Sequence, residues 1–456
     1  MARPRKNAAK VQGSLLAPDE VAEIPVEEQP YPLPEGWKWA YWGSCGDFIA
    51  GNAFKPDFQG KKGLLYPFYK VGSLKFSDNK GYLYAIEHSI SEETQKSIKA
   101  SIIPEYSIIF AKIGEAIRLN RRSINEKKCC IDNNLMAFVP QKTTYKYVYY
   151  WSLGIDLYKY TNATTVPAIR KTDLEKIVFP LPPLGEQQRI VDRIESLFAK
   201  LDDAKAKAEA VLDSFEIRKA AILHKAFTGE LTAKWRELKN ITLESWSSCP
   251  LISVLKENPR NGYSPKPVEY KTNVKSMTLS ATTSGFFRPE FFKYIDEEIP
   301  ENSYLWLSQG DILIQRANSL EKVGTSAIYT SGEHEFIYPD LIMKVQVKNP
   351  HSYKYIAYIL STQATLNYFR TNATGTAGNM PKINQQIVSN TPIVVPSSEE
   401  QQEIVRTLDR LLEKEQQVKE AVENVLSQIG LMKKAILARA FRGELGTHGA
   451  SKNSPQ

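Results

Sequence analysis

The chain has 456 residues, a formal net charge of +8, 42% hydrophobic and 11% aromatic residues, enough apolar content for cores in two to four domains. No apolar run approaches the roughly 18–20 residues that span a bilayer, and the basic first residues lead into no apolar stretch. Four cysteines without a Cys-x-x-Cys pair and five scattered histidines fit a reducing compartment and predict no metal site. The sequence therefore predicts a cytoplasmic protein without a membrane anchor.

The chain begins with a polar, Glu- and Pro-rich stretch, residues 1–30, which predicts a flexible tail. Residues 44–180 carry 20 Lys and Arg against 13 Asp and Glu, whereas residues 241–396 carry 14 against 13. The positive charge thus lies mainly in the first globular stretch. A polyanionic partner is compatible with this charge but is not required by it.

Two globular stretches, residues 31–180 and 239–395, have the mixed pattern of α/β domains. Short β-rich runs at 64–71, 107–113 and 312–315 alternate with turn residues and predict strands. Aromatic-rich segments at 145–160 and 353–370 predict helices, and such helices more often pack in a core than bind a cofactor.

The chain repeats itself, and this repeat decides its architecture. A constant offset of 214 residues superposes GEQQRIV at 185–191 on EEQQEIV at 399–405. The same offset superposes KAAILHKAFTGEL at 219–231 on KKAILARAFRGEL at 433–445. Upstream, Thr-Asn-Ala-Thr at 161–164 recurs at 371–374. The chain therefore consists of two copies of a unit, each a mixed domain followed by a long helix.

The helical regions, residues 181–238 and 396–446, have apolar residues spaced alternately by four and three, the period of a coiled-coil seam. Each helix of about 40 residues would be roughly 60 Å long. Because the phase matches in both copies, we expect two long antiparallel helices that join two pseudo-symmetric domains, with residues 447–456 as a flexible tail. The predicted seam residues are Ile190, Ile194, Leu197, Leu201, Val211, Phe215, Ile222, Ile404, Leu408, Leu411, Val418, Val422, Val425, Ile429 and Ile436.

Motifs for catalysis are absent from the sequence. It contains no Gly-x-x-x-x-Gly-Lys-Ser/Thr loop, no Gly-x-Gly-x-x-Gly after a strand, no His-Glu-x-x-His and no zinc-deaminase signature. We therefore predict no catalytic residues, no bound cofactor and no metal in this chain.

Basic residues mixed with Asn, Thr and Ser in predicted loops suit DNA, because Arg and Asn read guanine and adenine while Lys, Ser and Thr bind phosphates. Any one of them is equally compatible with an ordinary surface. The candidates in the first domain are Asn52, Lys55, Lys112, Arg118, Arg121, Arg122, Asn162, Thr164, Thr165 and Arg170. Those in the second domain are Arg260, Asn261, Lys266, Arg316, Asn318, Ser319, Asn372, Thr374, Thr376, Asn379 and Lys382.

The arrangement closely resembles the specificity subunit of Type I restriction-modification systems. The likeness rests on PLPPLGEQQRI at 180–190, the repeated helix ends, LPEGW at 33–37 and Arg-Asn-Gly at 260–262. It implies that residues 31–180 and 239–395 are target-recognition domains, each reading one half of a bipartite site in double-stranded DNA. It also implies that the helices set the spacing and dock two methyltransferase subunits. S-adenosylmethionine, ATP and Mg would then act on the methyltransferase and the restriction and translocase subunits.

Two alternatives remain open from the residues alone. One is a coiled-coil assembly scaffold with two protein-interaction domains and no DNA reading. The other is a nucleic-acid enzyme with an active site that matches no known motif.

Overall fold

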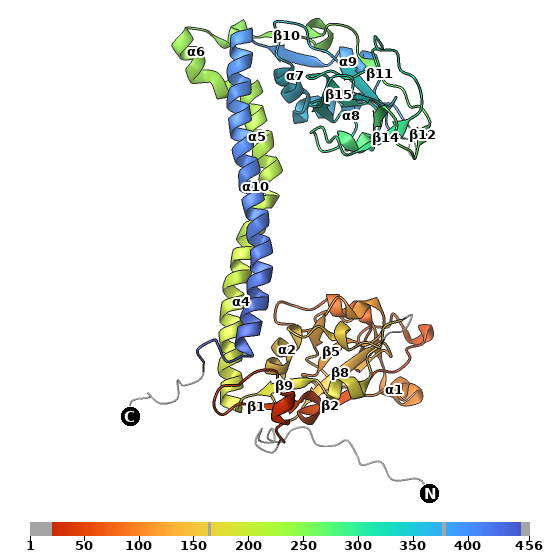
Figure 1. Cartoon of the computed structure of the whole chain (residues 1–456), viewed down its shortest axis with the longest axis vertical. Coiled ribbons are helices and arrows are strands. Elements are labelled where there is room, and N and C mark those ends of the chain that lie inside the picture. The colour runs from red at the N-terminus through yellow and green to blue at the C-terminus, as the bar shows by residue number, and fades with distance from the viewer. Residues whose placement is uncertain (1–20, 163–165, 376–379, 448–456) are drawn as a thin grey trace. The chain divides into compact units, whose positions relative to one another are not determined.

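The computed structural model describes residues 21–162, 166–375 and 380–447, and the chain folds as two compact units. Unit 1 comprises the residues up to Ala208 together with those from Asn424 onward, and unit 2 comprises Glu209–Glu423. Each unit therefore contains one globular domain and parts of two helices that are distant in the sequence (Figure 1).

The domain of unit 1 is built on a four-stranded antiparallel sheet of order β2-β8-β5-β6, whose central strands β5 and β8 are almost wholly buried. A three-stranded sheet, β4-β3-β7, and a two-stranded sheet, β1-β9, complete it. The strands are β1 (Lys38–Tyr41), β2 (Gly46–Ala50), β3 (Tyr66–Tyr69), β4 (Ser89–Ile90), β5 (Ile108–Ala111), β6 (Arg122–Ile124), β7 (Cys130–Ile131), β8 (Leu135–Pro140) and β9 (Val178–Leu181). The helices are α1 (Glu92–Ile98), α2 (Tyr145–Leu153) and α3 (Lys171–Glu175).

The domain of unit 2 repeats this plan with a sheet of order β11-β18-β15-β16, a second sheet of order β12-β14-β13-β17 and the pair β10-β19. Its strands are β10 (Ser247–Pro250), β11 (Arg260–Asn261), β12 (Pro267–Val268), β13 (Val274–Met277), β14 (Phe292–Ile295), β15 (Ile312–Gln315), β16 (Ser326–Ile328), β17 (Phe336–Ile337), β18 (Ile342–Val345) and β19 (Pro392–Val395). The helices of this unit's domain and linker are α6 (Ala233–Lys239), α7 (Tyr353–Leu360), α8 (Gln363–Asn372) and α9 (Gln385–Ser389). The predicted mixed α/β class is confirmed.

The two aromatic-rich segments form helices that are shorter than predicted. The first, α2, ends at Gly154 and is followed by a 3-10 turn, Leu157–Tyr160. The second divides into α7 and α8, because the Thr362 hydroxyl caps α8 by accepting a hydrogen bond from the Thr365 amide. Both segments contribute buried tyrosines to the cores, as expected.

The long helices are α4 (Leu184–Asp213), α5 (Phe215–Phe227) and α10 (Ser398–Ala440), so the helix of the first repeat is divided at Ser214. In unit 1, α4 packs antiparallel to the end of α10, with Lys433 Nζ 2.5 Å from Asp202 Oδ1. In unit 2, α5 packs antiparallel to the start of α10, with Arg218 Nε 2.8 Å from Glu415 Oε2. The predicted pairing of the long helices is confirmed, and Figure 1 shows them side by side.

The seam between the helices agrees only in part with the prediction. Ile190, Ile194, Ile404, Leu408 and Ile429 are buried. Partial burial is found for the predicted seam residues Leu197, Leu201, Val211, Phe215, Ile222, Leu411, Val422 and Ile436. Val418 and Val425, however, are 44% and 47% exposed, and their placement in the seam was wrong.

Two partly buried lysines of α10, which were not predicted to lie in the seam, contact aromatic rings of the facing helices. Lys419 lies 5.0 Å from the Phe215 ring centroid, and Lys433 lies 4.9 Å from that of Phe198. A lysine buries its methylene stem on an aromatic face while its ammonium group stays hydrated. The heptad period of the helices was predicted correctly. The error was to assign only apolar residues to the seam, because a lysine can also pack on an aromatic ring there.

The end of each repeat's helix docks on the domain of the other repeat. In unit 1, Phe441 packs edge-on against Tyr147 of α2 at 5.2 Å between ring centroids. In unit 2, Phe227 packs in the same way against Tyr355 of α7 at 5.4 Å. Phe227 and Phe441 are equivalent residues of the repeat, so the two copies have exchanged their helix ends.

This exchange predicts crossed effects of mutation. Phe441→Ala should destabilise unit 1 by about 3 kcal/mol, because a buried aromatic ring is lost and a cavity remains. Hydrogen exchange should then accelerate in α2 and stay unchanged in α7, whereas Phe227→Ala should produce the opposite pattern. Leu431→Ala, at an exposed position of the same helix, is the control. Acceleration in the domain of the mutated residue's own repeat would contradict the exchange.

Candidate nucleic-acid interface

A basic residue stands at the end of the central strand in both domains, where loops converge. Lys112 follows β5; its amide donates to Asn134 O (2.9 Å), and its carbonyl accepts from the Ile169 amide (2.9 Å). Arg316 follows β15, donates to Leu341 O (2.9 Å) and accepts from the Ile383 amide (2.8 Å). The same backbone contacts therefore place Lys112 and Arg316 between equivalent pairs of loops.

The recurring Thr-Asn-Ala-Thr segment forms one of these loops. Asn162 bridges to Ala168, and Thr374 bridges to Lys382, both of which follow the repeated segment. Ala168 and Lys382 in turn bridge to Ile113 and Ala317, which follow the central strands. Among the predicted contacts, Thr164, Thr165, Thr376 and Asn379 lie outside the described residues.

The residues that follow β2 and β11 also reach the loop cluster. A glycine in each of them allows the backbone to lie close to a neighbouring carbonyl. The amides of Asn52 and Tyr263 donate to Ile131 O and Tyr338 O, both at 2.9 Å. A Cβ atom on Gly51 would lie 1.9 Å from Asp132 O, and one on Gly262 would lie 2.1 Å from Tyr338 O. Only glycine fits there, which gives a structural reason for Gly262 in the Arg-Asn-Gly motif.

In the first domain, the structure brings Asn52, Lys112 and Asn162 to this loop cluster. The Asn52 amide group ties two loops together, donating to Lys99 O (3.3 Å) and accepting from the Ser101 amide (2.7 Å). Lys112 is partly exposed, and Lys55 and Arg170 are exposed.

The arginine cluster of the first domain divides into three different environments. Arg122 is only 5% exposed and donates to Asn120 Oδ1 (2.9 Å) and Ile155 O (3.1 Å); burial lowers the pKa of its guanidinium to about 9. This buried position in β6 contradicts the surface role expected of Arg122. Arg118 stacks on the Tyr158 ring at 3.6 Å and pairs with Glu115, while Arg121 is exposed.

In the second domain, Arg316, Thr374 and Lys382 meet at the loop cluster. The Arg316 side chain is partly buried and donates to Asp340 O at 3.3 Å, whereas Thr374 and Lys382 are exposed. Asn318 donates to Gln315 Oε1 (2.8 Å), which holds its amide at the adjacent turn. Ser319 and Lys266 are exposed.

The remaining candidates of the second domain are partly engaged within the protein. Arg260 pairs with Glu257 at 2.5 Å, and this hydrogen bond raises the pKa of its guanidinium. Asn261 lies next to it in β11, and the Asn372 side chain donates to Tyr368 O at 2.8 Å. Arg260 and Asn372 are therefore less available to a ligand than Lys382.

The repeated Glu-Gln-Gln contains residues with structural roles that the sequence analysis did not predict. Gln187 accepts hydrogen bonds from the Thr143 hydroxyl (3.0 Å) and the Thr144 amide (2.8 Å) before α2. Gln401 accepts from the Ser352 amide (3.0 Å) before α7. Both glutamines are fully buried, so each fixes the start of a domain helix to the start of a long helix. In the sequence, the only sign of these roles was that the Glu-Gln-Gln motif is repeated.

The glutamate of the same motif joins the two repeats. The Glu400 carboxylate accepts from the Thr232 hydroxyl (2.8 Å), Arg236 Nη1 (2.7 Å) and Trp246 Nε1 (2.9 Å). In unit 1, Glu186 accepts from the hydroxyl of Thr447 and pairs with Arg189. The threonine follows the Gly-Glu-Leu of the other repeat in both units, so a buried charge secures each exchanged helix end.

The part of the chain that the structure describes contains no group of three or more His, Cys, Asp or Glu placed to hold a metal ion. Within the same residues, no helix is both long enough and apolar enough to cross a bilayer.

The fold and the paired loop clusters define a protein with two homologous α/β domains, each anchored to the helix of the other repeat. The family model of the Type I restriction modification DNA specificity domain matches residues 34–212 and 257–426, and the chain belongs to this family. The sequence-based identification of the family is confirmed.

Curated relatives include the Type I restriction enzyme EcoKI specificity subunit of Escherichia coli strain K12, 28% identical over 287 residues. This match covers 62% of the present chain and 61% of that subunit's length. The EcoDI specificity subunit of Escherichia coli is 25% identical over 331 residues, which make up 67% of this chain and 71% of that protein.

Two solved structures share the fold. The HsdS subunit from Thermoanaerobacter tengcongensis has a TM-score of 0.57 and 18% identity, with 92% of this chain and 100% of that chain covered. A chain from a structural study of complex assembly and conformational transition of the type I R-M system has a TM-score of 0.68 and 17% identity. That match covers 91% of this chain and 100% of the other.

Proposed function

We propose that this chain is the non-catalytic DNA specificity subunit of a Type I restriction-modification complex, with one domain reading each half of a bipartite site in double-stranded DNA. The observation that carries this proposal is the duplicated loop cluster, with Lys112 and Arg316 held by the same backbone contacts in two domains of one specificity family. Two equivalent DNA-reading domains in one chain match a DNA site that has two halves.

The chemistry of the loop clusters supports contact with DNA. Lys112, Lys382 and Arg170 supply charge for phosphates, and Arg316 and Asn318 supply the donors that read guanine and adenine edges. Arg122 is excluded from these contacts because it is buried. Since the second domain is almost neutral, its partners would contribute much of the non-specific binding to phosphates.

Exchange of one domain tests this function. Replacing residues 239–395 with the corresponding domain of another family member leaves Thr232, Arg236 and Glu400 in place, so these hydrogen bonds at the exchanged helix end are kept. In a complete complex, the map of methylated bases should change in one half of the site only. The reciprocal exchange of residues 44–170 should change the other half. A change in both halves would refute independent reading, and a chain that retains no DNA selectively would favour a scaffold.

The paired helices would set the gap between the two half-sites. The boundary between the units falls at equivalent places on both helices, after Ala208 and after Glu423. Seven residues inserted at both places keep the heptad phase and leave the contacts inside each unit intact.

The double insertion should lengthen the helix pair by roughly 10 Å, or about three base pairs of B-DNA, with both half-sites unchanged. Sequencing of methylated sites reports the gap directly. An insertion after Ala208 alone is the control. It makes the paired helices unequal in length, so the complex should lose methylation activity rather than recognise a wider gap. An unchanged gap with the double insertion would eliminate the ruler role.

Docking of two modification subunits on the helices accounts for exposed apolar residues at equivalent positions. Ile217 on α5 and Leu431 on α10 are 72% and 55% exposed and are related by the offset of 214 residues. Single exposed apolar residues are common on protein surfaces, so the support here is their repetition at equivalent positions, one for each modification subunit. S-adenosylmethionine would be bound by those subunits, and ATP and Mg by restriction and translocase subunits.

Charged substitutions test these docking sites. Ile217→Asp and Leu431→Asp should each weaken binding of one modification subunit at least tenfold, and the double variant should bind neither, because a carboxylate would be buried against apolar surface. Mass photometry of reconstituted complexes gives the stoichiometry. Gln428→Asp, at an exposed position of α10, is the matched control. Full binding of two subunits by the double variant would place the docking surface elsewhere.

A further inference from the structure

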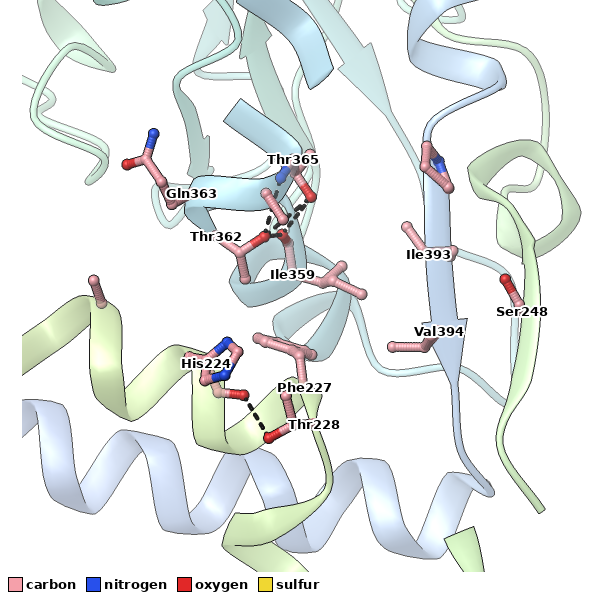
Figure 2. Close-up of a pocket in the computed structure, with 13 residues that line it drawn as sticks. His224, Phe227, Thr228, Ser248, Ile359, Thr362, Gln363, Thr365, Ile393 and Val394 are labelled. Atoms are coloured by element: carbon pink, nitrogen blue, oxygen red, sulfur yellow. Dashed lines mark hydrogen bonds between the residues drawn. The ribbon is translucent and has the colours of Figure 1, made fainter. Parts of the chain in front are cut away.

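Unit 2 contains a pocket of about 330 Å³ between α5, the corner of α7 and α8, and the β10-β19 pair. Figure 2 shows Phe227 of α5 pointing toward Val394 of β19, with His224 one turn earlier on the helix. The hydroxyls of Thr362 and Thr365 bond to each other at 3.1 Å and to Ile359 O, so they are already satisfied. The remaining walls are largely apolar, which suits a ring or an aliphatic group.

The repeat identifies what occupies the same place in unit 1. Strand β1 pairs with β9 in the register in which β10 pairs with β19, so Trp39 is the equivalent of Ser248. The pocket residues Phe227 and Thr228 correspond to Phe441 and Arg442. In unit 1 this place holds a large indole ring that is only 3% exposed, whereas β10 offers a serine.

The chain's own residues 21–31 cover this surface in unit 1. The Ile24 amide donates to Trp39 O (3.1 Å), and Trp39 Nε1 donates to Tyr31 O (2.9 Å). The Tyr31 ring packs edge-on against Trp39 at 4.9 Å, and its hydroxyl donates to Phe441 O (3.1 Å). Residues 21–31 thus lie over β1, with Ile24 bonded to the strand and a 3-10 turn at Val26–Glu28, and they place an aromatic ring against the helix end.

No comparable segment covers β10 among the residues that the structure describes: Ser247, Ser248 and Pro250 are exposed, whereas Trp39 and Ala40 of β1 are buried. The residues that precede β10 are held elsewhere. Trp246 donates to Glu400 Oε2, and Lys239 pairs with Glu399 at 2.6 Å. An occupant of this site in unit 2 must therefore come from outside the segment that leads into the strand.

We propose that the pocket and the open edge of β10 bind a short segment of a partner protein that inserts an aromatic side chain beside Phe227 and Ser248. Residues 21–31 of unit 1 define the chemistry of this segment: apolar residues along the strand edge, then a tyrosine or tryptophan. The pocket supplies the space that Trp39 and Tyr31 fill in unit 1. This docking site is separate from the loop clusters after β5 and β15 and from Ile217 and Leu431.

A peptide copy of residues 21–33 added to the full-length chain tests the site by calorimetry and NMR. The wild-type chain should bind one peptide saturably, with Ile24 at the strand edge and Tyr31 in the pocket. A peptide with Tyr31→Ala should bind at least tenfold more weakly. The covalently attached segment of unit 1 stays in place because its effective concentration exceeds that of the free peptide.

Substitutions in the chain locate the binding. Ser248→Trp recreates the indole on which Tyr31 packs in unit 1 and should strengthen peptide binding. Ser247→Trp, at the neighbouring residue on the opposite face of the strand, should leave binding unchanged. Ala220→Trp fills the pocket from α5 and should abolish peptide binding without lowering the melting temperature. Absence of saturable binding to the wild type, or wild-type affinity in Ala220→Trp, would overturn the proposal.

Discussion

The structure depends on the exchange of helix ends between the two repeats. Phe227 and Phe441 each fill a site on the other repeat's domain, against Tyr355 and Tyr147. The buried carboxylates Glu400 and Glu186 then accept hydrogen bonds from threonines of the arriving segments. Removing one partner of a buried charge leaves the other unsatisfied at a cost of several kcal/mol, so these contacts specify one pairing of the helices. Neither repeat completes its own core.

This exchange separates the helical framework from the loops that would contact DNA. Gln187 and Gln401 tie α2 and α7 to the starts of the long helices. The loop clusters lie beyond the central strands, and their side chains take no part in these anchoring contacts. The same main-chain hydrogen bonds place the backbones of Lys112 and Arg316, so a different side chain there is compatible with the same fold. Under the proposed function, one framework would therefore be able to carry loops that read different sequences.

The sequence predicted the duplication, the fold class and the helix pairing, because all three depend on long patterns. The sequence-based predictions were wrong where a single side chain lies in an environment that is unusual for its residue type. Lys419 and Lys433 lie over aromatic rings of the facing helices, whereas Val418 and Val425 are exposed. Arg122 is buried because Asn120 and the carbonyl of Ile155, 33 residues away, accept hydrogen bonds from its guanidinium. These outcomes depend on rings or carbonyls that are distant in the chain, which a local pattern does not encode. The roles of the buried Glu and Gln were likewise invisible, although their repetition pointed to them.

The two units are built on one plan but differ where the chain enters each domain. Unit 1 is entered by residues 21–37, which close over β1 and bury Trp37 and Trp39. Unit 2 is entered through α6, whose Arg236 is held by Glu400 and whose path leaves β10 exposed. In a chain of two repeats, the second copy must be entered by a connection from the helix of the first. This connection could contact either the end of the long helix or the edge of β10. Here its residues form hydrogen bonds at the helix end. The asymmetry therefore follows from covalent connectivity, and it gives the two otherwise equivalent units different surfaces for partners.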